Sequence, residues 1–391
     1  MRSPQYTITP RHIQAHAAYR IQKHVRLPEH GRKCRAAVLW AVLFWAASRI
    51  TSLAAACAAL CDAPSDTAAH DALLAGLPAF AELQRRLNRA LQGDLPDALS
   101  RKRQPLAVDL TLIPYHGQHL HDPNEIYRSQ AKSGTSHFHA YATAYVIRKG
   151  QRFTVALTAV QANEPLPEIL KRLLRQAAKA SIRPRYLLLD RGFCSVDVIR
   201  YLQAARHAWM MPLTLRGRKA GHPKGPSGSR VFALWKKSGW GEYTMTSAAG
   251  RKARFRVCIK CRNRRGERGR HGREALVYAF GGLKPSSYQW VKETYRSRFA
   301  IETSYRQMHQ ARIRTCTKDP LLRLLYVGVA LLLRNVWVWL HWEVLAERCR
   351  GHRRIQLDRM TFRQMLLWVQ HYVEAWLGIS EETQAERPAW C

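Results

Sequence analysis

The stretch RYLLLDRGF, residues 185–193, decides the fold, because it joins a short apolar strand to an acid at its end. Apolar residues recur at helical spacing over 164–180, before this stretch, and again over 196–205, after it. A strand between two helices is typical of an α/β layer. Ligands of open α/β sheets bind beyond the carboxyl ends of the strands, so Asp190 is predicted to face a site.

Further strands are predicted on the amino-terminal side of this stretch. Residues 106–114, LAVDLTLIP, form an apolar run that contains Asp109, and a hairpin turn at Lys149-Gly150-Gln151 is predicted to join the runs 139–148 and 153–160. With a strand over 209–215, the order is three strands, helix, strand, helix, strand, which favours a mixed sheet. A carboxylate inside an apolar strand is costly unless something pairs with it, so Asp109 is a second candidate site residue.

A third acidic candidate lies in 288–313, which we interpret as one long amphipathic helix. Tyr295, Arg298, Glu302 and His309 fall at i, i+3, i+7 and i+14, and on an α-helix these positions share an arc of roughly 60°. Glu302 is expected to ligate a metal, while the planar fork of Arg298 pairs with phosphate oxygens. The alternative is a solvated helix with an i,i+4 Arg298–Glu302 pair, and either Asp could instead cap a helix or pair with an arginine.

Charge indicates the kind of partner. The chain carries 64 Lys+Arg against 27 Asp+Glu, a net charge of +37, so a polyanion is expected, with nucleic acid favoured over an anionic membrane. Residues 214–273 hold 18 of these cations and two acids, with strand-like pieces at 231–235, 242–246, 253–259 and, just beyond, 275–280. We interpret this segment as a β-rich insertion that contacts the DNA backbone through Arg262, Arg264 and Arg265.

The remaining segments are predicted to be helical. Ser65 is a plausible N-cap for a helix over 66–77, and the helices around Ala63-Pro64-Ser65 form either a helix-turn-helix or an ordinary packed pair. Residues 99–105 are interpreted as a basic linker and 346–391 as a polar helical tail. The apolar runs 36–47 and 324–342 are too short or too interrupted for a bilayer, which needs about 20 apolar residues, so both are predicted to be buried.

Cysteine spacing and the amino-terminal sequence indicate the compartment. The nine cysteines show no secreted-domain spacing, which suits a reducing cytosol. The first residues lack an apolar core behind the first charge, so no signal peptide is expected.

Three motifs together resemble those of the IS4-type DDE transposases. Asp109 lies in AVDLT, Asp190 in LLLDRGF, and Tyr295-x2-Arg298-x3-Glu302 matches the helical signature, while His309 stands where the family has a lysine. The resemblance covers about residues 105–342. It implies a ribonuclease H-like core, an α/β mixed sheet with flanking helices, and a β-rich insertion between the second Asp and the Glu.

The activity expected from this resemblance is DNA transposition. Asp109, Asp190 and Glu302 are expected to bind two Mg²⁺ ions, with Mn²⁺ as a substitute, that activate water or a 3′-hydroxyl and steady the leaving oxygen. Tyr295, Arg298 and His309 are expected to contact DNA or its phosphates. Tyr295 as a nucleophile is disfavoured, because tyrosine recombinases surround that residue with Arg and His donors rather than acids.

The predicted organisation has four regions. They are a helical DNA-binding region over 1–104, a catalytic core over 105–214 and 284–345, the insertion over 215–283, and the tail over 346–391. The expected partners are the terminal inverted repeats and target DNA, bound by a homodimer in the cytoplasm of a bacterium or archaeon, at the nucleoid, without a membrane. The alternatives are a related metal-dependent nuclease without strand transfer and a non-catalytic DNA-binding remnant.

Overall fold

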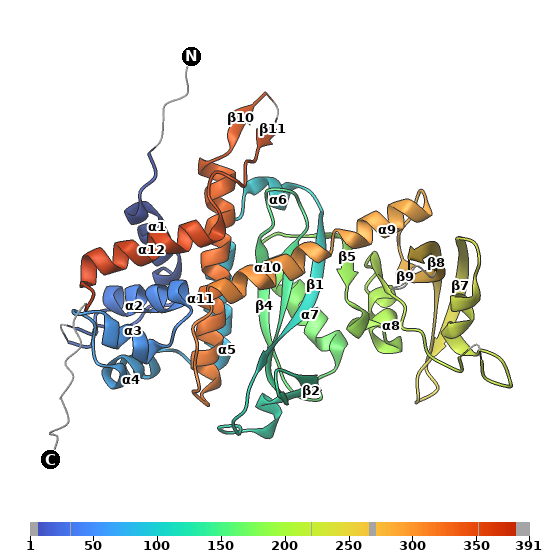
Figure 1. The fold of residues 1–391 in the computed structure, drawn as a ribbon, viewed down its shortest axis with the longest axis horizontal. Helices are drawn as coiled ribbons and strands as arrows, with labels where there is room; N and C mark the ends of the chain where they lie inside the picture. The colour runs from blue at the N-terminus through green and yellow to red at the C-terminus, as the bar shows by residue number, and fades with distance from the viewer. Residues whose placement is uncertain (1–6, 32, 220, 266–270, 351, 381–391) are drawn as a thin grey trace. The chain divides into compact units, whose positions relative to one another are not determined.

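The computed structural model describes residues 7–31, 33–219, 221–265, 271–350 and 352–380, with the side chains of 263–265 and 271–273 left out of the description. The ribbon is drawn in Figure 1. The described chain divides into two compact units. The first comprises residues up to 95, 114–139 and from 304 onward, and the second comprises 96–113 and 140–303.

The first unit is largely helical, as predicted for the amino-terminal region. Its helices are α1 (Pro10–Gln22), α2 (Ala36–Arg49), α3 (Leu53–Ala59), α4 (Asp66–Gly76), α5 (Phe80–Gln92), α11 (Pro320–Trp339) and α12 (Phe362–Leu377). Ser65 caps α4 as predicted, because its hydroxyl accepts a hydrogen bond from the Ala68 amide at 3.3 Å. Helices α3 and α4 are consecutive and flank the Ala63-Pro64-Ser65 turn. A DNA-binding helix-turn-helix at this place stays a prediction, beside the alternative of an ordinary packed pair.

Helix α11 is the core of this unit. By length and composition, Pro320–Val344 could cross a membrane, with a mean hydropathy of 1.7, yet 94% of the apolar window is buried inside the structure. Gly328 allows close packing, since a Cβ there would lie 2.6 Å from Leu87. Both apolar runs are thus buried helices, as the sequence predicts.

The predicted polar helical tail is wrong in its first part. A π-helical turn (Leu340–Val344) ends α11, and a hairpin of β10 (Glu347–Cys349) and β11 (His352–Arg354) follows before α12. Strands of three residues are too short to show a sequence period. Helix α12 buries one apolar face, including Met365, Leu366 and Val369, so it is a packed helix.

The second unit is built on a mixed sheet, as predicted. Its elements are α6 (Asp97–Arg101), β1 (Gln104–Pro114), β3 (Thr135–Val146), β4 (Thr154–Val160), α7 (Leu166–Lys179), β5 (Pro184–Leu189), α8 (Val196–Ala204), β6 (Trp209–Pro212), β7 (Gly239–Thr246), β8 (Lys252–Arg265), β9 (His271–Gly281) and α9 (Tyr288–Arg296). Strand β2 (Tyr127–Lys132) and the start of β3 fall in the first unit. The order is β2-β3-β1-β5-β6-β9-β8-β7, with β4 also on β3.

The insertion continues the core sheet. Strand β9 pairs with β6 in antiparallel register, and β8 and β7 follow it outward. The strand predicted over 231–235 is wrong, since Gly228–Leu234 is a 3₁₀ helix. There Ser229 accepts a hydrogen bond from the Arg216 amide and donates one to the Thr214 carbonyl, which folds the segment back on itself.

The predicted basic linker over 99–105 is also wrong. Residues Asp97–Arg101 form α6, and β1 already begins at Gln104. The buried amide of Gln104 donates hydrogen bonds to the carbonyls of Leu99 at 3.1 Å and Lys102 at 2.8 Å. These bonds tie the helix to the strand, so the segment is ordered.

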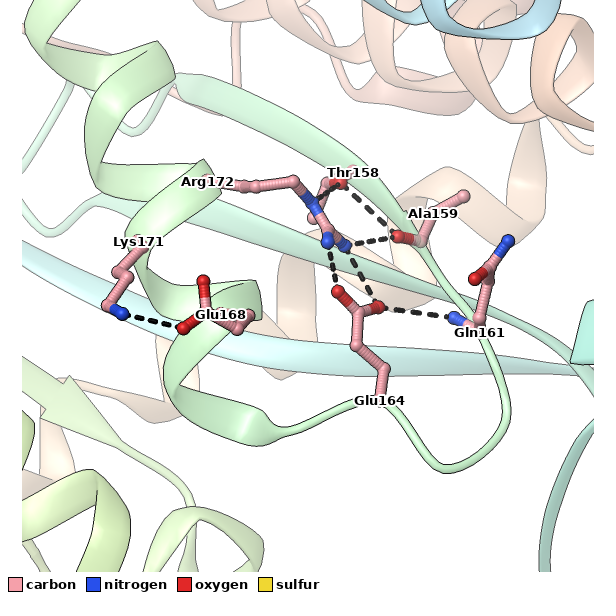
Figure 2. A network of polar contacts seen from close by, with 7 residues as sticks. All are labelled: Thr158, Ala159, Gln161, Glu164, Glu168, Lys171 and Arg172. Atoms are coloured by element: carbon pink, nitrogen blue, oxygen red, sulfur yellow. Dashed lines mark hydrogen bonds and ion pairs between the residues drawn. The ribbon is translucent and has the colours of Figure 1, made fainter.

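An ion-paired cluster fixes the connection from β4 to α7 (Figure 2). Arg172 on α7 donates to Thr158 Oγ1 at 3.0 Å and to the Ala159 carbonyl at 2.9 Å, both on β4, and it pairs with Glu164 in the loop. Glu164 also accepts a hydrogen bond from the Gln161 amide at 3.3 Å. These contacts tie the loop to the carboxyl end of β4 and to α7.

The single helix predicted over 288–313 is interrupted. Helix α9 ends at Arg296, and α10 (Phe299–Gln310) begins after a turn at Ser297 and Arg298. The Ser297 hydroxyl donates to the Thr294 carbonyl at 2.6 Å, and the Arg298 amide bonds the carbonyl three residues back, at Tyr295. Such i−3 bonds tighten the backbone and end the α-helical ladder.

Candidate active site

Asp109 and Asp190 follow neighbouring positions on two parallel strands. Strands β1 and β5 pair with Val108 opposite Leu189, so each aspartate is the next residue along its strand. Parallel strands lie about 4.8 Å apart, and residues in register project to the same face. The register of the sheet thus brings together two carboxylates that are 81 positions apart in the sequence.

Arg298 joins these two carboxylates to Glu302. Its Nη1 lies 3.1 Å from Asp109 Oδ2, and its Nη2 lies 3.2 Å from Asp190 Oδ1 and 2.9 Å from Glu302 Oε1. The Asp190 and Glu302 oxygens, which share one nitrogen, are therefore no further apart than these two distances laid end to end. The structure brings all three predicted acids to one guanidinium.

The turn between α9 and α10 makes this contact possible. Arg298 is the last residue of the turn, only 4% exposed, and its guanidinium lies 5.5 Å from the ring centres of both Tyr295 and Phe299. The sequence prediction placed Arg298 against phosphate oxygens. In the structure the same planar fork instead binds carboxylates.

Burial distinguishes Asp109 from the other two acids. The Asp109 side chain is 16% exposed, whereas those of Asp190 and Glu302 are 42% exposed. Burial raises the pKa of Asp109 to about 6, against the opposing effect of the Arg298 cation. The site holds one buried carboxylate with two that are open to solvent.

Tyr295 is a packing residue in this structure. It is 5% exposed and lies with Leu188, Tyr278 and Val291 in an apolar cluster between α9 and the sheet. Its hydroxyl donates to the Leu189 carbonyl at 3.3 Å, and burial raises its pKa above the usual range. A buried, protonated phenol suits a residue that holds α9 on β5, and it does not suit a nucleophile.

A cavity of about 1020 Å³ opens beside Asp190. Asp190, Arg298 and Phe299 line it at one side, and strands β6 and β9 with helix α9 supply other walls. Its basic lining residues besides Arg298 are Arg191, Arg262, Lys292 and Arg296. Of these, Arg191, Lys292 and Arg296 were missed in the sequence, although Arg191 adjoins Asp190 and the other two are an i,i+4 pair beside Tyr295.

The other predicted contact residues differ in how far the structure describes them. Arg262 Nη2 pairs with Glu274 at 2.7 Å on neighbouring strands. The side chains of Arg264 and Arg265 lie outside the described residues. His309 is exposed in the last turn of α10, within the first unit, and partial burial with the nearby Arg312 cation lowers its pKa.

The donor set fits a hard divalent cation. Carboxylate oxygens are the ligands that Mg²⁺ and Mn²⁺ prefer, and two of the three acids are accessible from solvent. With Arg298 between them, no three acid, imidazole or thiolate groups in the described ranges are close enough to enclose an ion. A metal cation bound by these acids would therefore replace the Arg298 guanidinium as their counter-charge.

A comparison with protein families agrees with this arrangement. The family described as transposase DDE domain matches residues 100–331, which is more than half of the chain. The chain belongs to this family. The DDE transposase match begins just before β1 and ends inside α11, so it includes all three acids and the insertion.

Other comparisons add less. No curated protein matches the sequence. One solved structure, the cryo-EM structure of a piggyBac transposase synaptic complex with hairpin DNA, is similar with a TM-score of 0.48 and 10% identity, covering 95% of this chain and 74% of that one.

Family membership fixes the class of activity. The protein is a DNA transposase, an enzyme that acts on DNA. Transposases of this family generally use divalent metal ions. This agrees with the oxygen-rich donor set formed by Asp109 within β1, Asp190 after β5 and Glu302 on α10.

Proposed function

We propose that Asp109, Asp190 and Glu302 are the catalytic carboxylates with which this transposase cleaves transposon ends and joins them to target DNA. The observation that carries the proposal is their convergence on Arg298. The parallel register of β1 and β5 supplies two of the acids, and the first turn of α10 supplies the third. A structural ion pair would need one acid for this arginine, whereas three acids carry a surplus of negative charge.

The three acids would hold two Mg²⁺ ions, with Mn²⁺ as a substitute. Such ions supply a nucleophilic water or 3′-hydroxyl and stabilise the leaving oxygen during phosphoryl transfer. Asp109, the buried acid, is fixed by the Leu110 amide, which donates to its Oδ1 at 2.8 Å. Asp190 and Glu302 can bind a cation that arrives from solvent, since both side chains are partly exposed.

Arg298 would act as the resident counter-cation of the site. Its guanidinium neutralises the acids while no other cation is bound, which limits their mutual repulsion. Two hydrogen bonds, to Asp109 and Glu302, and an ion pair with Asp190 fix the guanidinium, and Tyr295 fixes the helix before it. Arg298 is therefore proposed to organise the acids first and to contact phosphate only when they are otherwise neutralised.

The basic cavity is proposed to hold the DNA strand next to the scissile phosphate. Arg191, Lys292 and Arg296 surround a wall of apolar residues such as Leu213 and Val277. Cations that follow a phosphate backbone and apolar surface that accepts bases together suit single-stranded DNA. The Arg262–Glu274 pair at the cavity leaves that arginine's charge partly compensated.

The proposed DNA partners are the terminal inverted repeats and the target DNA. A homodimer is proposed to hold them, so that two ends are joined together. The proposed location is the nucleoid, in the cytoplasm of a bacterium or archaeon. Size measurement of complexes with one and with two end duplexes tests this assembly. A complex that holds a single end at every protein concentration would overturn it.

The test of the catalytic assignment uses Asp109→Asn, Asp190→Asn and Glu302→Gln. Each should lower strand cleavage and strand transfer by roughly a thousandfold or more, because several kcal/mol of metal-dependent stabilisation is lost. Each should also weaken Mn²⁺ binding measured by calorimetry, while duplex binding in EDTA persists. Glu293→Gln, which removes an exposed acid of α9, is the matched control and should keep full activity.

Strand transfer separates the proposed activity from the alternative of a nuclease. An end duplex with a free 3′-hydroxyl should become joined to a target plasmid in the presence of Mg²⁺. Cleavage without any joined product would favour a nuclease. Full activity of all three variants would exclude these acids from catalysis.

A further inference from the structure

The hairpin β10–β11 in the first unit presents a concentration of cations outside the residues that the family match covers. Its strands pair Glu347 with Arg354, Arg348 with Arg353 and Cys349 with His352. Figure 1 shows the hairpin projecting beyond the end of α11. Arg348, Arg350, His352 and Arg354 are all exposed.

The base of the hairpin is fixed by interactions that use its acids. Arg353 pairs with Glu343 at 2.8 Å and lies 5.1 Å from the centre of the Trp342 ring. Arg359 pairs with Glu347 at 2.8 Å, and the Leu345 carbonyl accepts a further bond from Arg359 at 3.0 Å. Glu343 and Glu347 are thus each paired with an arginine that holds the hairpin in place.

The outer cations have no such compensation. Across the described ranges, no ion pair is found for Arg348, Arg350 or Arg354. Arg348 stands directly opposite Arg353, whose charge Glu343 already compensates, so Arg348 is the cation of this cross-strand pair that is open to an external anion. A two-stranded ribbon of three-residue strands is itself marginal in water. An external polyanion would supply the missing counter-charge and stabilise the ribbon.

We propose that the β10–β11 hairpin is a DNA-binding ribbon that enters a groove of duplex DNA and contacts backbone phosphates through Arg348, Arg350 and Arg354. The major groove admits a two-stranded β-ribbon, and arginine forks match phosphate oxygens. The inference rests on the proposed function only in that the protein acts on duplex DNA. It adds a contact that is separate from the catalytic acids.

Other occupants fit the hairpin less well. A second copy would bring identical cations together along the exposed strand edges. An anionic membrane surface favours apolar side chains beside the cations, and the exposed strand residues are Arg348, Cys349, His352 and Arg354. Duplex DNA requires only charge and a ribbon of suitable width.

The test is the salt dependence of duplex binding in EDTA, where no strand is cut. The triple variant Arg348→Gln, Arg350→Gln, Arg354→Gln is compared with the wild-type chain on a duplex of unrelated sequence. Each phosphate contact contributes about 0.9 to the slope of log K against log salt. Loss of three contacts should flatten the slope by about 2.7 and weaken binding by up to about 100-fold at 0.15 M salt.

A second triple variant controls for net charge. Arg175, Lys179 and Arg183 are exposed in the second unit, in the last turn of α7 or just after it. Arg183 directly precedes β5, whereas Asp190 follows the other end of that strand. Replacement of the three cations by Gln removes the same charge and should leave the slope nearly unchanged.

The outcomes are distinguishable from failure of the catalytic assignment. An unchanged slope in the hairpin variant, or an equal loss in the control, would overturn the proposal. The proposal would also be overturned if the hairpin arginines raised the affinity for anionic vesicles or single-stranded RNA but not the affinity for duplex DNA. Because EDTA prevents cleavage, inactive catalytic variants still report on the hairpin, and an unchanged thermal transition shows that the triple variant is folded.

Discussion

Replacing Asp109 with Asn should stabilise the metal-free protein above pH 6 while abolishing its activity. In the folded protein the pKa of Asp109 is raised from 3.8 to about 6, mainly by burial. A folded-state pKa above the unfolded one means that stability from this group is present below the unfolded pKa and is lost as pH rises through about 6. At pH 8 the ionised side chain therefore lowers the free energy of unfolding.

The size of the effect follows from the pKa change. At 1.36 kcal/mol per pKa unit, a rise from 3.8 to about 6 corresponds to about 3 kcal/mol. The side chain is only 16% exposed, so little of this is screened by solvent. Asn is neutral and nearly the same size, so Asp109→Asn should gain up to about 3 kcal/mol at pH 8 and almost nothing below about pH 4.

Urea denaturation in EDTA at the two pH values measures this gain. Addition of Mn²⁺ should stabilise the wild-type protein more than the variant and so reduce the difference. Asp190→Asn is the matched control: its side chain is 42% exposed, so removing its charge relieves little burial. A variant that is less stable than wild type at pH 8, or equally more stable at both pH values, would refute the reasoning.

Three further predictions concern residues around the site and its scaffold. Arg172→Met leaves Glu164 with 12% exposure and no cation, and should cost about 1–3 kcal/mol of unfolding free energy, whereas Lys171→Met, which removes an exposed pair, should cost about 0–0.5 kcal/mol; equal losses in denaturation would contradict the role of the cluster in Figure 2. Tyr295→Phe should keep cleavage within about tenfold of wild type, because it removes only the hydroxyl's hydrogen bonds, with the Leu189 carbonyl and with Arg298, and complete loss in a folded variant would indicate a nucleophile. The pKa of His309 is lowered, so on rising pH the imidazole loses its charge already below pH 6.5. Binding of DNA ends should therefore weaken as pH rises below 6.5, whereas the affinity of His309→Lys should stay constant over the same pH range. Parallel pH profiles of the two proteins would show that His309 is not a phosphate contact.

Much of the core could be predicted because the signals are local. The apolar runs that became β1, β4 and β5 are bounded by turns or acids, and the helical spacing of α7 is regular. An acid at the end of β5 and another within β1 both conflict with their apolar surroundings, which marked them as site residues. Residues whose local chemistry opposes their surroundings are where function is expected.

Two of the misplaced elements depend on hydrogen bonds to distant parts of the chain. The 3₁₀ helix at Gly228–Leu234 depends on Ser229, which bonds the backbone of residues 13 and 15 positions earlier. The turn at Ser297 and Arg298 interrupts a sequence whose spacing is helical throughout. The guanidinium of Arg298 in this turn is held by Asp109, which lies 189 positions away in the sequence.

The sequence by itself determined which residues are the candidates for catalysis, because the three acids, their motifs and the excess of basic charge are properties of residue identity and spacing. Tertiary structure alone decided how these residues are brought together. The register of β1 on β5 sets Asp109 beside Asp190, and the turn before α10 sets Arg298 between them and Glu302. Strand register and burial arise from pairings between distant segments, so a pattern within one segment cannot specify them.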